Sequence, residues 1–491
     1  MGFYKIIISS TICVILLLLV PEGLHAQNGF GFDDSGFGFS AEKFSSFSVK
    51  IGGEIRSNLR FYYNEVGSTD AFQNLQPGDF FSGSLNFQAS YSFAQAITKL
   101  DWYPVADGST PPIKVDEGYL RAFFGPVTIE AGLRKLTWGK ADSFGPLDVI
   151  NPLDFSDMSR LSDPLSIKIA RPMLRATWSL GSFSRVEGVF IPWFQGHQLA
   201  TSGRWAPNQI TALVDGIDTV LYMTALSHPD LYMYIDTIRH TINSLLDNIE
   251  DFFPKTNSLE LAQAGLRFTT SIGASDIGIQ YFFGRNPRPT ISGINPAAFL
   301  DLSMPSDDPN ALHPEALIPE IRYNYYHQIG VDFARVIAGY NIRAELGVNI
   351  TKDLDGTDGT VENPAFVWSL GFDRDLFWGI NLNLQATGQI RLFHNRIRDS
   401  IFADCEAGSN LSSTRITGVI SRKFMREALE IKVTGLWGIE EKDFLIMPAV
   451  VWSRNNARAE LSIGFFGGNR SGELGQYRDN SFFRMNLSYS F

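Results

Sequence analysis

Opposite charges are interspersed along the segment between residues 140 and 171. Six polar side chains in it are candidates for contact with a solute: Lys140, Asp142, Asp148, Asn151, Asp154 and Arg160. Acidic and basic groups on opposite sides of a narrow passage create a transverse field, which selects small hydrophilic solutes by size and charge. If the segment instead folds outward, the same charges form an ordinary solvated loop. The apolar Val149 and Ile150 beside the Asn151-Pro152 pair favour a packed, inward conformation.

Segments of alternating polarity surround this charged segment. From Phe81 to Phe93, apolar residues and glycine alternate with serine, asparagine and glutamine. Because successive side chains of a strand point to opposite faces, such a segment has one apolar face and one polar face. About eighteen segments with this period lie between Phe47 and Phe491, and they predict a series of antiparallel strands.

Charged side chains recur on the polar faces of these strands. Nine of them are candidate lining residues of an interior: Glu54, Arg56, Arg60, Arg134, Arg343, Glu345, Arg391, Arg458 and Glu460. A barrel of about eighteen strands is too wide to be filled by the side chains of its own wall. A polar interior of that width holds water and forms a pore, unless loops or the N-terminal segment fill it.

Composition restricts how this chain could enter a membrane. Hydrophobic residues make up 44% of its 491 residues, the mean hydropathy is −0.03, and the only long apolar run is Ile6–Val20. A spanning helix needs about 20 consecutive apolar residues, so a closed barrel, which pairs all its backbone polar groups, is the remaining membrane form. Aromatic residues at 13% fit interfacial girdles, and a net charge of −11 argues against nucleic acid as a partner.

The connections between the predicted strands alternate in length. Long connections near residues 64–79, 139–170, 195–258, 285–319 and 394–411 are separated by short turns, as expected if long loops lie outside and turns face the periplasm. The strand Ala96–Tyr103 and the short connection Ile439–Asp443 are the weakest members of the series. The predicted fold is therefore an all-β, transmembrane antiparallel β-barrel of about eighteen strands, with sixteen strands as the alternative.

Two segments precede the barrel, which is predicted at residues 47–491. Lys5, the apolar run after it and Ala26 predict a cleaved secretory signal peptide at residues 1–26. Residues 27–46 are rich in glycine and phenylalanine and are predicted to form a periplasmic tail, with a plug or a docking tag as alternatives. Cleavage would leave Cys405 as the single cysteine, and its acidic neighbours Asp404 and Glu406 predict an exposed loop thiol.

The longest connection, residues 195–258, contains a predicted helix. Apolar residues recur at helical spacing from Leu231 to Ile249, and Pro229 is suited to the first turn. This helical insertion is expected to cap the barrel externally, with entry into the lumen or binding of a partner as alternatives.

The C-terminal strand ends in Tyr489, Ser490 and Phe491. This pattern resembles the closing strand of bacterial outer-membrane barrels. The resemblance implies a location in the cell outer membrane, contact with outer-membrane lipid, and recognition of Tyr489 and Phe491 by the barrel-assembly machinery. The last strand is then expected to pair with the first, near Phe47 to Tyr63.

A second resemblance covers Val115 to Phe155. Trp138, Gly139 and Asp142, followed by Asp148, Asn151, Pro152 and Asp154, resemble the motifs of an uncharacterised family of Gram-negative outer-membrane porin-like barrels. Within this stretch, strand parity places Arg134 inside, Trp138 is expected at the aromatic belt, and Gly139 permits a backbone turn.

Metal and enzyme motifs are weak. Asp353, Asp355 and Asp358 have the spacing of a partial calcium loop, but the later bidentate glutamate is absent. The histidines are scattered without a partner arrangement for catalysis, and His327 falls on a lipid-facing position. Neither an enzyme activity nor a cofactor is expected.

The sequence supports two hypotheses about function. The first is a passive outer-membrane channel for small solutes with a polar, charged lumen. The alternative is a surface adhesin or structural barrel that acts through its long loops, especially residues 195–258 and 285–319. The sequence leaves open the transported solute, the formation of a homo-oligomer and the position of the long loops.

Overall fold

The structure of the chain is a computed structural model. It describes residues 44–63, 81–103, 112–227, 256–292, 320–399, 404–406 and 410–491, together with residues 229, 239, 240, 254, 301 and 313. The predicted signal peptide and most of the Gly/Phe-rich segment lie outside these residues.

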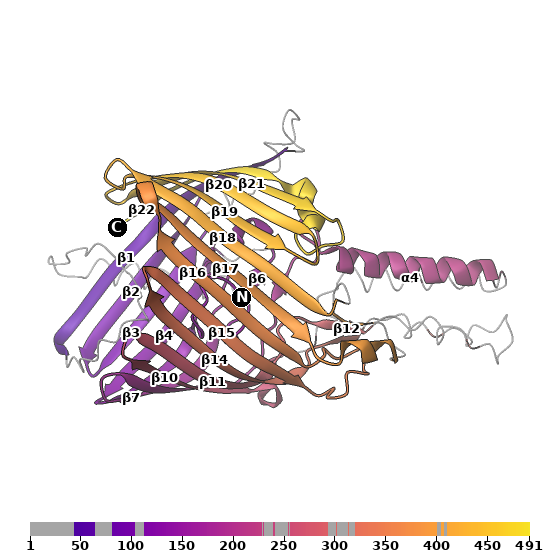
Figure 1. The fold of residues 1–491 in the computed structure, drawn as a ribbon, viewed down its shortest axis with the longest axis horizontal. Helices are drawn as coiled ribbons and strands as arrows, with labels where there is room; N and C mark the ends of the chain where they lie inside the picture. Colours follow the sequence, from indigo (N-terminus) through magenta and orange to yellow (C-terminus); the bar gives the residue numbers. More distant parts are fainter. Residues whose placement is uncertain are drawn as a thin grey trace, which may run out of the picture.

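Eighteen antiparallel strands in the described part of the chain form one closed sheet, in which each strand pairs with its neighbours along the chain (Figure 1). They are β1 (Phe44–Tyr62), β2 (Ser82–Ser92), β3 (Ala94–Trp102), β4 (Ile113–Phe124), β5 (Val127–Arg134), β7 (Arg171–Leu180), β8 (Ser184–Ile191), β10 (Gln263–Ile272), β11 (Ser275–Arg285), β14 (Tyr325–Ile337), β15 (Tyr340–Thr351), β16 (Ala365–Asp375), β17 (Ile380–Arg391), β18 (Ser412–Phe424), β19 (Leu429–Gly438), β20 (Asp443–Arg454), β21 (Ala457–Gly468) and β22 (Phe482–Ser490). The sheet closes where β22 pairs with β1.

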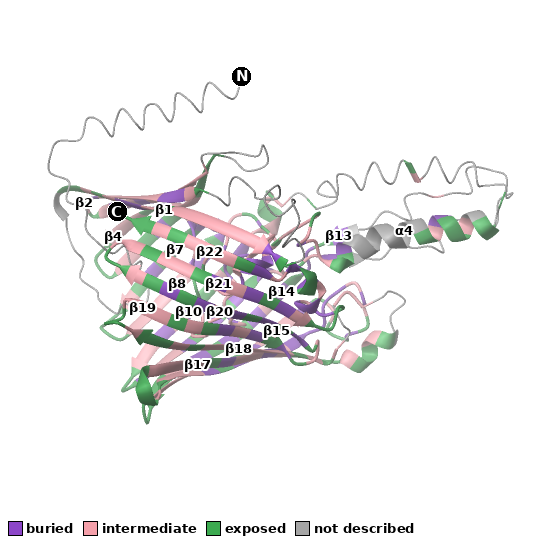
Figure 2. Ribbon diagram, turned by 90° about the horizontal axis from the view of Figure 1, so that it is seen from above, coloured by how far each residue is buried: buried purple, intermediate pink, exposed green. Residues whose placement is uncertain are grey.

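The remaining elements lie in the connections. The short strands β6 (Asp154–Phe155) and β9 (Gln198–Leu199) pair in parallel, and β12 (Thr290–Ser292) pairs with β13 (Glu320–Arg322). Helix α4 (Asn208–Ser227) projects from the end of the barrel that carries the long connections, which we call the loop end (Figure 1). The C-terminus lies at the opposite end, the turn end (Figure 2). No helix in the described residues is long and apolar enough to cross a bilayer.

Alternation of polarity gives the wall two different faces. Leu120, Trp178 and Ile329 are exposed on the outer face, whereas Gln280 and Gln328 are buried on the inner face. Figure 2 shows this alternation as exposed and buried bands along the strands. The outer face is therefore apolar and suited to lipid, and the inner face is polar.

The seam between β1 and β22 depends on the terminal residue. The backbone N–H of Phe491 donates to the carbonyl oxygen of Gly53, and the N–H of Gly53 donates to the carbonyl oxygen of Phe491, both at 2.9 Å. A Cβ atom at Gly53 would lie 2.6 Å from the Phe491 ring and 2.6 Å from the carbonyl oxygen of Ser84. Glycine at position 53 is therefore required for the close approach of the last aromatic ring to the wall.

The predicted count of eighteen strands is confirmed, and the alternative of sixteen is wrong. The two least certain segments of the predicted series are both part of the barrel. The segment predicted at Ala96–Tyr103 is the full strand β3, and residues 439–442 join β19 to β20 at the loop end. The first strand begins at Phe44, inside the segment predicted as a tail.

The structure describes a helix in the longest connection that the sequence did not predict. The described helix of this connection is α4, which ends at Ser227, before the predicted start. Its Ile210 and Leu221 are buried, so apolar contacts stabilise a helix earlier in the connection. The predicted helix at residues 231–249 lies outside the described residues, apart from the helical Arg239 and His240.

The seam yields a prediction. Replacing Gly53 with alanine should lower the free energy of unfolding by about 1 to 3 kcal/mol, because the added methyl group overlaps the Phe491 ring and a backbone oxygen. Thermal unfolding of the refolded barrel, followed by circular dichroism, measures the effect. Gly435→Ala is the matched control because a Cβ atom there meets no atom within 4 Å. Equal unfolding temperatures for the two variants would contradict this role of the seam.

Candidate functional site

The connection of residues 135–170, which we call the inward loop, folds inside the barrel. Gln280 on β11 donates a hydrogen bond to the carbonyl oxygen of Leu147 at 2.8 Å, and Gln328 on β14 donates to that of Pro146 at 3.0 Å. A Cβ atom at Gly347 on β15 would lie 3.0 Å from the Leu147 side chain. The loop leaves β5 and therefore reaches the inner faces of β11, β14 and β15.

Glu345, near the middle of β15, holds the tip of the inward loop. Its carboxylate accepts hydrogen bonds from the backbone N–H groups of Ala141 at 2.7 Å and Leu147 at 3.2 Å, and also from that of Lys140. Gly139 has a φ of 88°, and a Cβ atom there would overlap the Glu345 carboxylate. Three N–H groups directed at one carboxylate form an anion-binding nest, so Glu345 acts as an anchor.

Polar side chains on β15, β16 and β17 bind the same tip. Asp142 pairs with Arg343, which also pairs with Asp373. Asn383 donates to the Asp142 carboxylate at 2.7 Å, and the Asp142 N–H donates to Gln385 at 2.8 Å. One predicted lining residue, Arg343, and one predicted loop residue, Asp142, thus meet in one contact.

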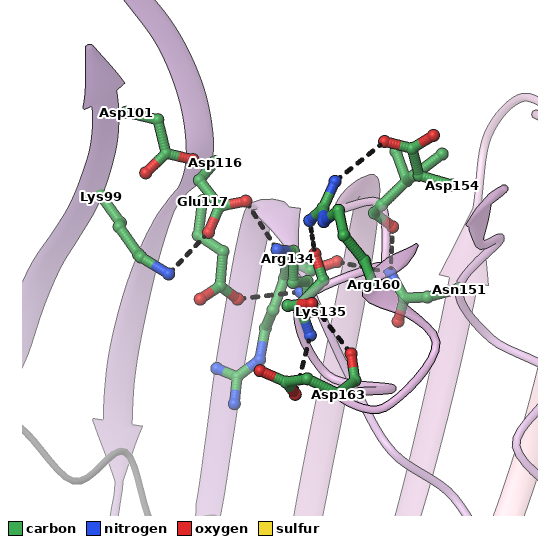
Figure 3. Close-up of polar contacts among 12 residues, drawn as sticks. Lys99, Asp101, Asp116, Glu117, Arg134, Lys135, Asn151, Asp154, Arg160 and Asp163 are labelled. Carbon is green, nitrogen blue, oxygen red and sulfur yellow. Dashed lines mark hydrogen bonds and ion pairs between the residues drawn. The ribbon is translucent and has the colours of Figure 1, made fainter. Parts of the chain in front are cut away.

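The two ends of the inward loop are tied to each other through Asn151. Its amide oxygen accepts from the Leu136 N–H at 2.7 Å, and its amide nitrogen donates to the carbonyl oxygens of Arg134 at 3.0 Å and Ile169 at 2.8 Å (Figure 3). Beside them, Lys168 pairs with Asp148 at 2.6 Å. Burial raises the pKa of the Asp148 carboxyl, and Lys168 opposes that shift. The predicted Asn151 and Asp148 therefore have structural contacts at the base of the loop.

Further contacts fix the loop to the wall near its base. Lys135 pairs with Asp116 on β4 at 2.6 Å, and Asp116 also pairs with Lys99 on β3 at 2.8 Å. Arg160 pairs with Asp154 at 3.4 Å within the loop (Figure 3). Lys140 lies 3.9 Å from Asp276. Every charged residue predicted in this loop thus has an opposite charge nearby.

The far side of the inward loop contacts β1 and β22. Arg60 pairs with Asp157 at 2.5 Å and donates to the Ser159 hydroxyl at 2.6 Å. Burial acts to raise the pKa of Asp157, but the Arg60 charge and the hydrogen bonds from Arg60 and Ser159 outweigh it, so this pKa is lowered. An apolar cluster continues the contact; its members include Met158, Leu161, Trp205, Phe466, Tyr477 and Phe482.

A second connection interlocks with the inward loop. His197 accepts a hydrogen bond at Nδ1 from the Leu153 N–H at 2.8 Å, next to the parallel pair of β6 and β9. Burial, assisted by the Arg288 charge, lowers the pKa of His197 to about 3. The imidazole is therefore neutral and free to accept at this nitrogen.

The predicted lining residues fall into two groups by exposure. The side chains of Arg134 and Arg391 are 4% and 2% exposed, and Glu345 is 1% exposed. In contrast, the side chains of Arg56 and Glu54 are 37% and 32% exposed. Arg458 is also exposed, whereas Arg60, Arg343 and Glu460 are partly covered. The predicted lining residues that stay exposed are therefore Glu54 and Arg56 on β1 and Arg458 on β21.

Buried ion pairs support the wall at the base of the loop. Glu130 on β5 pairs with Arg134, with Arg175 at 2.9 Å and with Arg121 at 2.5 Å. Arg175 also pairs with Glu187 on β8 at 2.6 Å. Two carboxylates, those of Glu130 and Glu187, thus face the three guanidinium groups of this network.

Two sequence interpretations are corrected here. Trp138 does not lie in the aromatic belt: β5 ends at Arg134, and the Trp138 indole is buried inside, where it donates to Glu187 at 2.7 Å. The expected position in the aromatic belt is wrong because the strand ends four residues earlier and Trp138 belongs to the inward loop. Cys405 is not a fully exposed thiol, and burial raises its pKa above the usual range.

The calcium hypothesis finds no support in the geometry. Asp353 accepts backbone N–H groups from Gly356 at 3.1 Å and Asp358 at 2.9 Å, and Asp358 accepts from Thr360. Within the described ranges, no group of three or more histidine, cysteine or acidic side chains is arranged to hold a metal ion. These aspartates stabilise turns.

Sequence reasoning missed the amide residues that hold the loop. Gln280, Gln328 and Gln385 bind its backbone. In the sequence these glutamines look like any other polar residues on inward faces, because the loop residues that they bind are more than a hundred positions away.

Comparisons with known proteins give similarity of fold only. No protein-family model matches the chain, and no curated protein sequence matches it. Among solved structures, it is similar to the trimer form of OmpT, an outer membrane protein of Vibrio cholerae, with 11% identity, a TM-score of 0.38, and coverage of 91% of this chain and 100% of that chain.

Two further structures are similar at the same level. The outer membrane channel DcaP of Acinetobacter baumannii aligns with 9% identity, a TM-score of 0.38, and coverage of 92% of this chain and 100% of that chain. Wzi of Escherichia coli, a carbohydrate-binding β-barrel involved in capsule assembly, aligns with 11% identity, a TM-score of 0.43, and coverage of 90% of this chain and 84% of that chain. Scores this low carry no argument about what the chain does.

The Glu345 anchor yields a prediction. Glu345→Ala removes the shared acceptor of three backbone N–H groups, each worth about 1.5 to 3 kcal/mol when bonded to a charged group. We expect the tip to detach, and limited trypsin digestion of the folded barrel should then cleave after Lys140. Glu54→Ala is the control, because Glu54 pairs with Arg56 on its own strand. Resistance of Glu345→Ala to cleavage would refute the anchoring role.

Proposed function

We propose that this chain forms an outer-membrane channel for the passive diffusion of small solutes. Its closed wall, apolar outside and polar inside, supports this proposal because such a wall suits a lipid bilayer around a water-filled lumen. The alternation of long and short connections supports one orientation, with the turns and the C-terminus toward the periplasm. The predicted signal peptide and the terminal Phe491 fit export and assembly into that membrane. The proposal includes no catalytic step and no cofactor.

The observation that carries the proposal is the docking of the inward loop at the middle of the barrel. Glu345 and Gln385 hold its tip against β15 and β17, while Arg60 holds its other side against β1. A loop fixed there narrows the lumen, and Glu54, Arg56 and Arg458 are the predicted lining residues that stay exposed. The charges predicted to create a transverse field serve mainly to attach the loop.

Planar-bilayer conductance of the purified protein tests this proposal. The wild type should open discrete channels, and deletion of residues 141–165 should increase the single-channel conductance because it removes the narrowing segment. Glu345→Ala should give larger or noisier openings by freeing the tip. Ile329→Ala, a change on the outer face, controls for insertion into the bilayer.

Two outcomes would contradict the proposal. Absence of openings from correctly folded wild-type protein would exclude a channel. Loss of all openings after deletion of residues 141–165 would exclude the inward loop as the narrowing segment, provided that the deleted protein still folds.

A second candidate is adhesion through the external connections. Helix α4 projects from the loop end, and its Tyr222, Met223 and Leu226 are exposed (Figure 1). Exposed apolar side chains on a projecting helix are suited to contact with another surface. Deletion of residues 208–227 separates the candidates: loss of cell-surface attachment with unchanged conductance would assign adhesion to α4.

A further inference from the structure

Three cationic side chains on neighbouring strands converge on one carboxylate in the lumen. Glu460 on β21 lies 2.9 Å from Arg458 on the same strand, 3.7 Å from Lys432 on β19 and 3.7 Å from Arg484 on β22. We call these four residues the basic cluster. The side chains of Lys432 and Arg458 are 27% and 49% exposed, so the cluster faces water.

The cluster lies on the inner face of the wall. Ser462, two residues after Glu460, is buried inside, whereas the intervening Leu461 is exposed on the lipid side. Arg484 also donates to the carbonyl oxygen of Ser159 in the inward loop, at 3.4 Å. Arg458 is the second residue of β21 and lies next to the turn end. The basic cluster thus extends from the inward loop toward the proposed periplasmic exit.

The charges of the cluster do not balance. One carboxylate faces three cations, whereas the buried Arg391 pairs with both Asp404 and Glu406. Partly exposed ion pairs are weak, so Arg458 and Lys432 can exchange their contact with Glu460 for a contact with a passing anion. Low-dielectric walls around a narrow lumen concentrate the resulting positive potential.

From this geometry we infer that the basic cluster is a subsite for small anions, such as carboxylate- or phosphate-bearing solutes. Guanidinium and ammonium groups bind such anions through short, charge-assisted hydrogen bonds. The inference rests on the proposed channel function and assigns it a selectivity. The inferred preference for anions is opposite to the one that the net charge of the whole chain, −11, would favour. The two differ because selectivity depends on the side chains that face the passage.

Reversal potentials in a potassium chloride gradient test the inference. The wild-type channel should prefer chloride over potassium. The double variant Lys432→Glu, Arg458→Glu should reverse the sign of the reversal potential, and Lys432→Gln, Arg458→Gln should bring it close to zero. Arg470→Glu is the control: it makes the same kind of charge change in the connection after β21, where Arg470 pairs with Asp479 at 3.6 Å, and it should keep the preference for chloride.

Inorganic phosphate serves as the probe of binding. Added to one side, it should reduce the chloride current of the wild type and of Arg470→Glu, and it should have a much smaller effect on the glutamine double variant. Cation preference in the wild type, or equal block of all three proteins by phosphate, would overturn the inference and leave the channel intact. Absence of any openings would instead refute the proposed channel itself. Discrete openings of each variant report that it has folded.

Discussion

The lumen is organised around the carboxylate of Glu345. A carboxylate buried in the wall of a barrel is strongly destabilising unless hydrogen-bond donors surround it. Here the donors come from the backbone of residues 140, 141 and 147, about two hundred positions away in the chain. Gly139 and Gly145 leave the space for this approach. Because the donors are main-chain groups, the backbone path of the whole loop tip follows from this one interaction.

The position of the loop then divides the interior into two parts. The inner faces of β11, β14 and β15 are covered by the loop, and there Gln280, Gln328 and Asp332 are buried. On β1 and β22 the loop contacts Arg60 and Arg484, whereas Arg56 and Arg458, which lie nearer the turn end, stay exposed. Charges on the covered part stabilise the packing, whereas charges on the open part remain available to solutes. The same residue types therefore have different roles according to their distance from the loop.

Much of the wall could be predicted from the chain alone. The period of two in segments such as Phe81–Phe93 identified both the strands and their lipid-facing sides, and the terminal Phe491 identified the strand that closes the barrel. The prediction of an aromatic-belt position for Trp138 was wrong. Trp138 lies four residues after Arg134, the last residue of β5, and its side chain is buried in the lumen, where it donates to Glu187. The sequence did not predict α4 in the long connection, whereas the helix predicted at residues 231–249 lies outside the described residues apart from the helical Arg239 and His240.

The sequence by itself therefore determined the strands, their number, their two faces and the closure of the barrel, since these depend on residues that are close in the chain or on a repeated local pattern. Only the tertiary structure decided where the charged loop lies and which of the inward residues face solvent. Asp142 and Arg343 carry no local signal that they meet; their contact depends on the closure of the wall, which brings β15 opposite the loop from β5. The convergence of Lys432, Arg458 and Arg484 on Glu460 likewise exists only because β19, β20, β21 and β22 lie side by side in the wall.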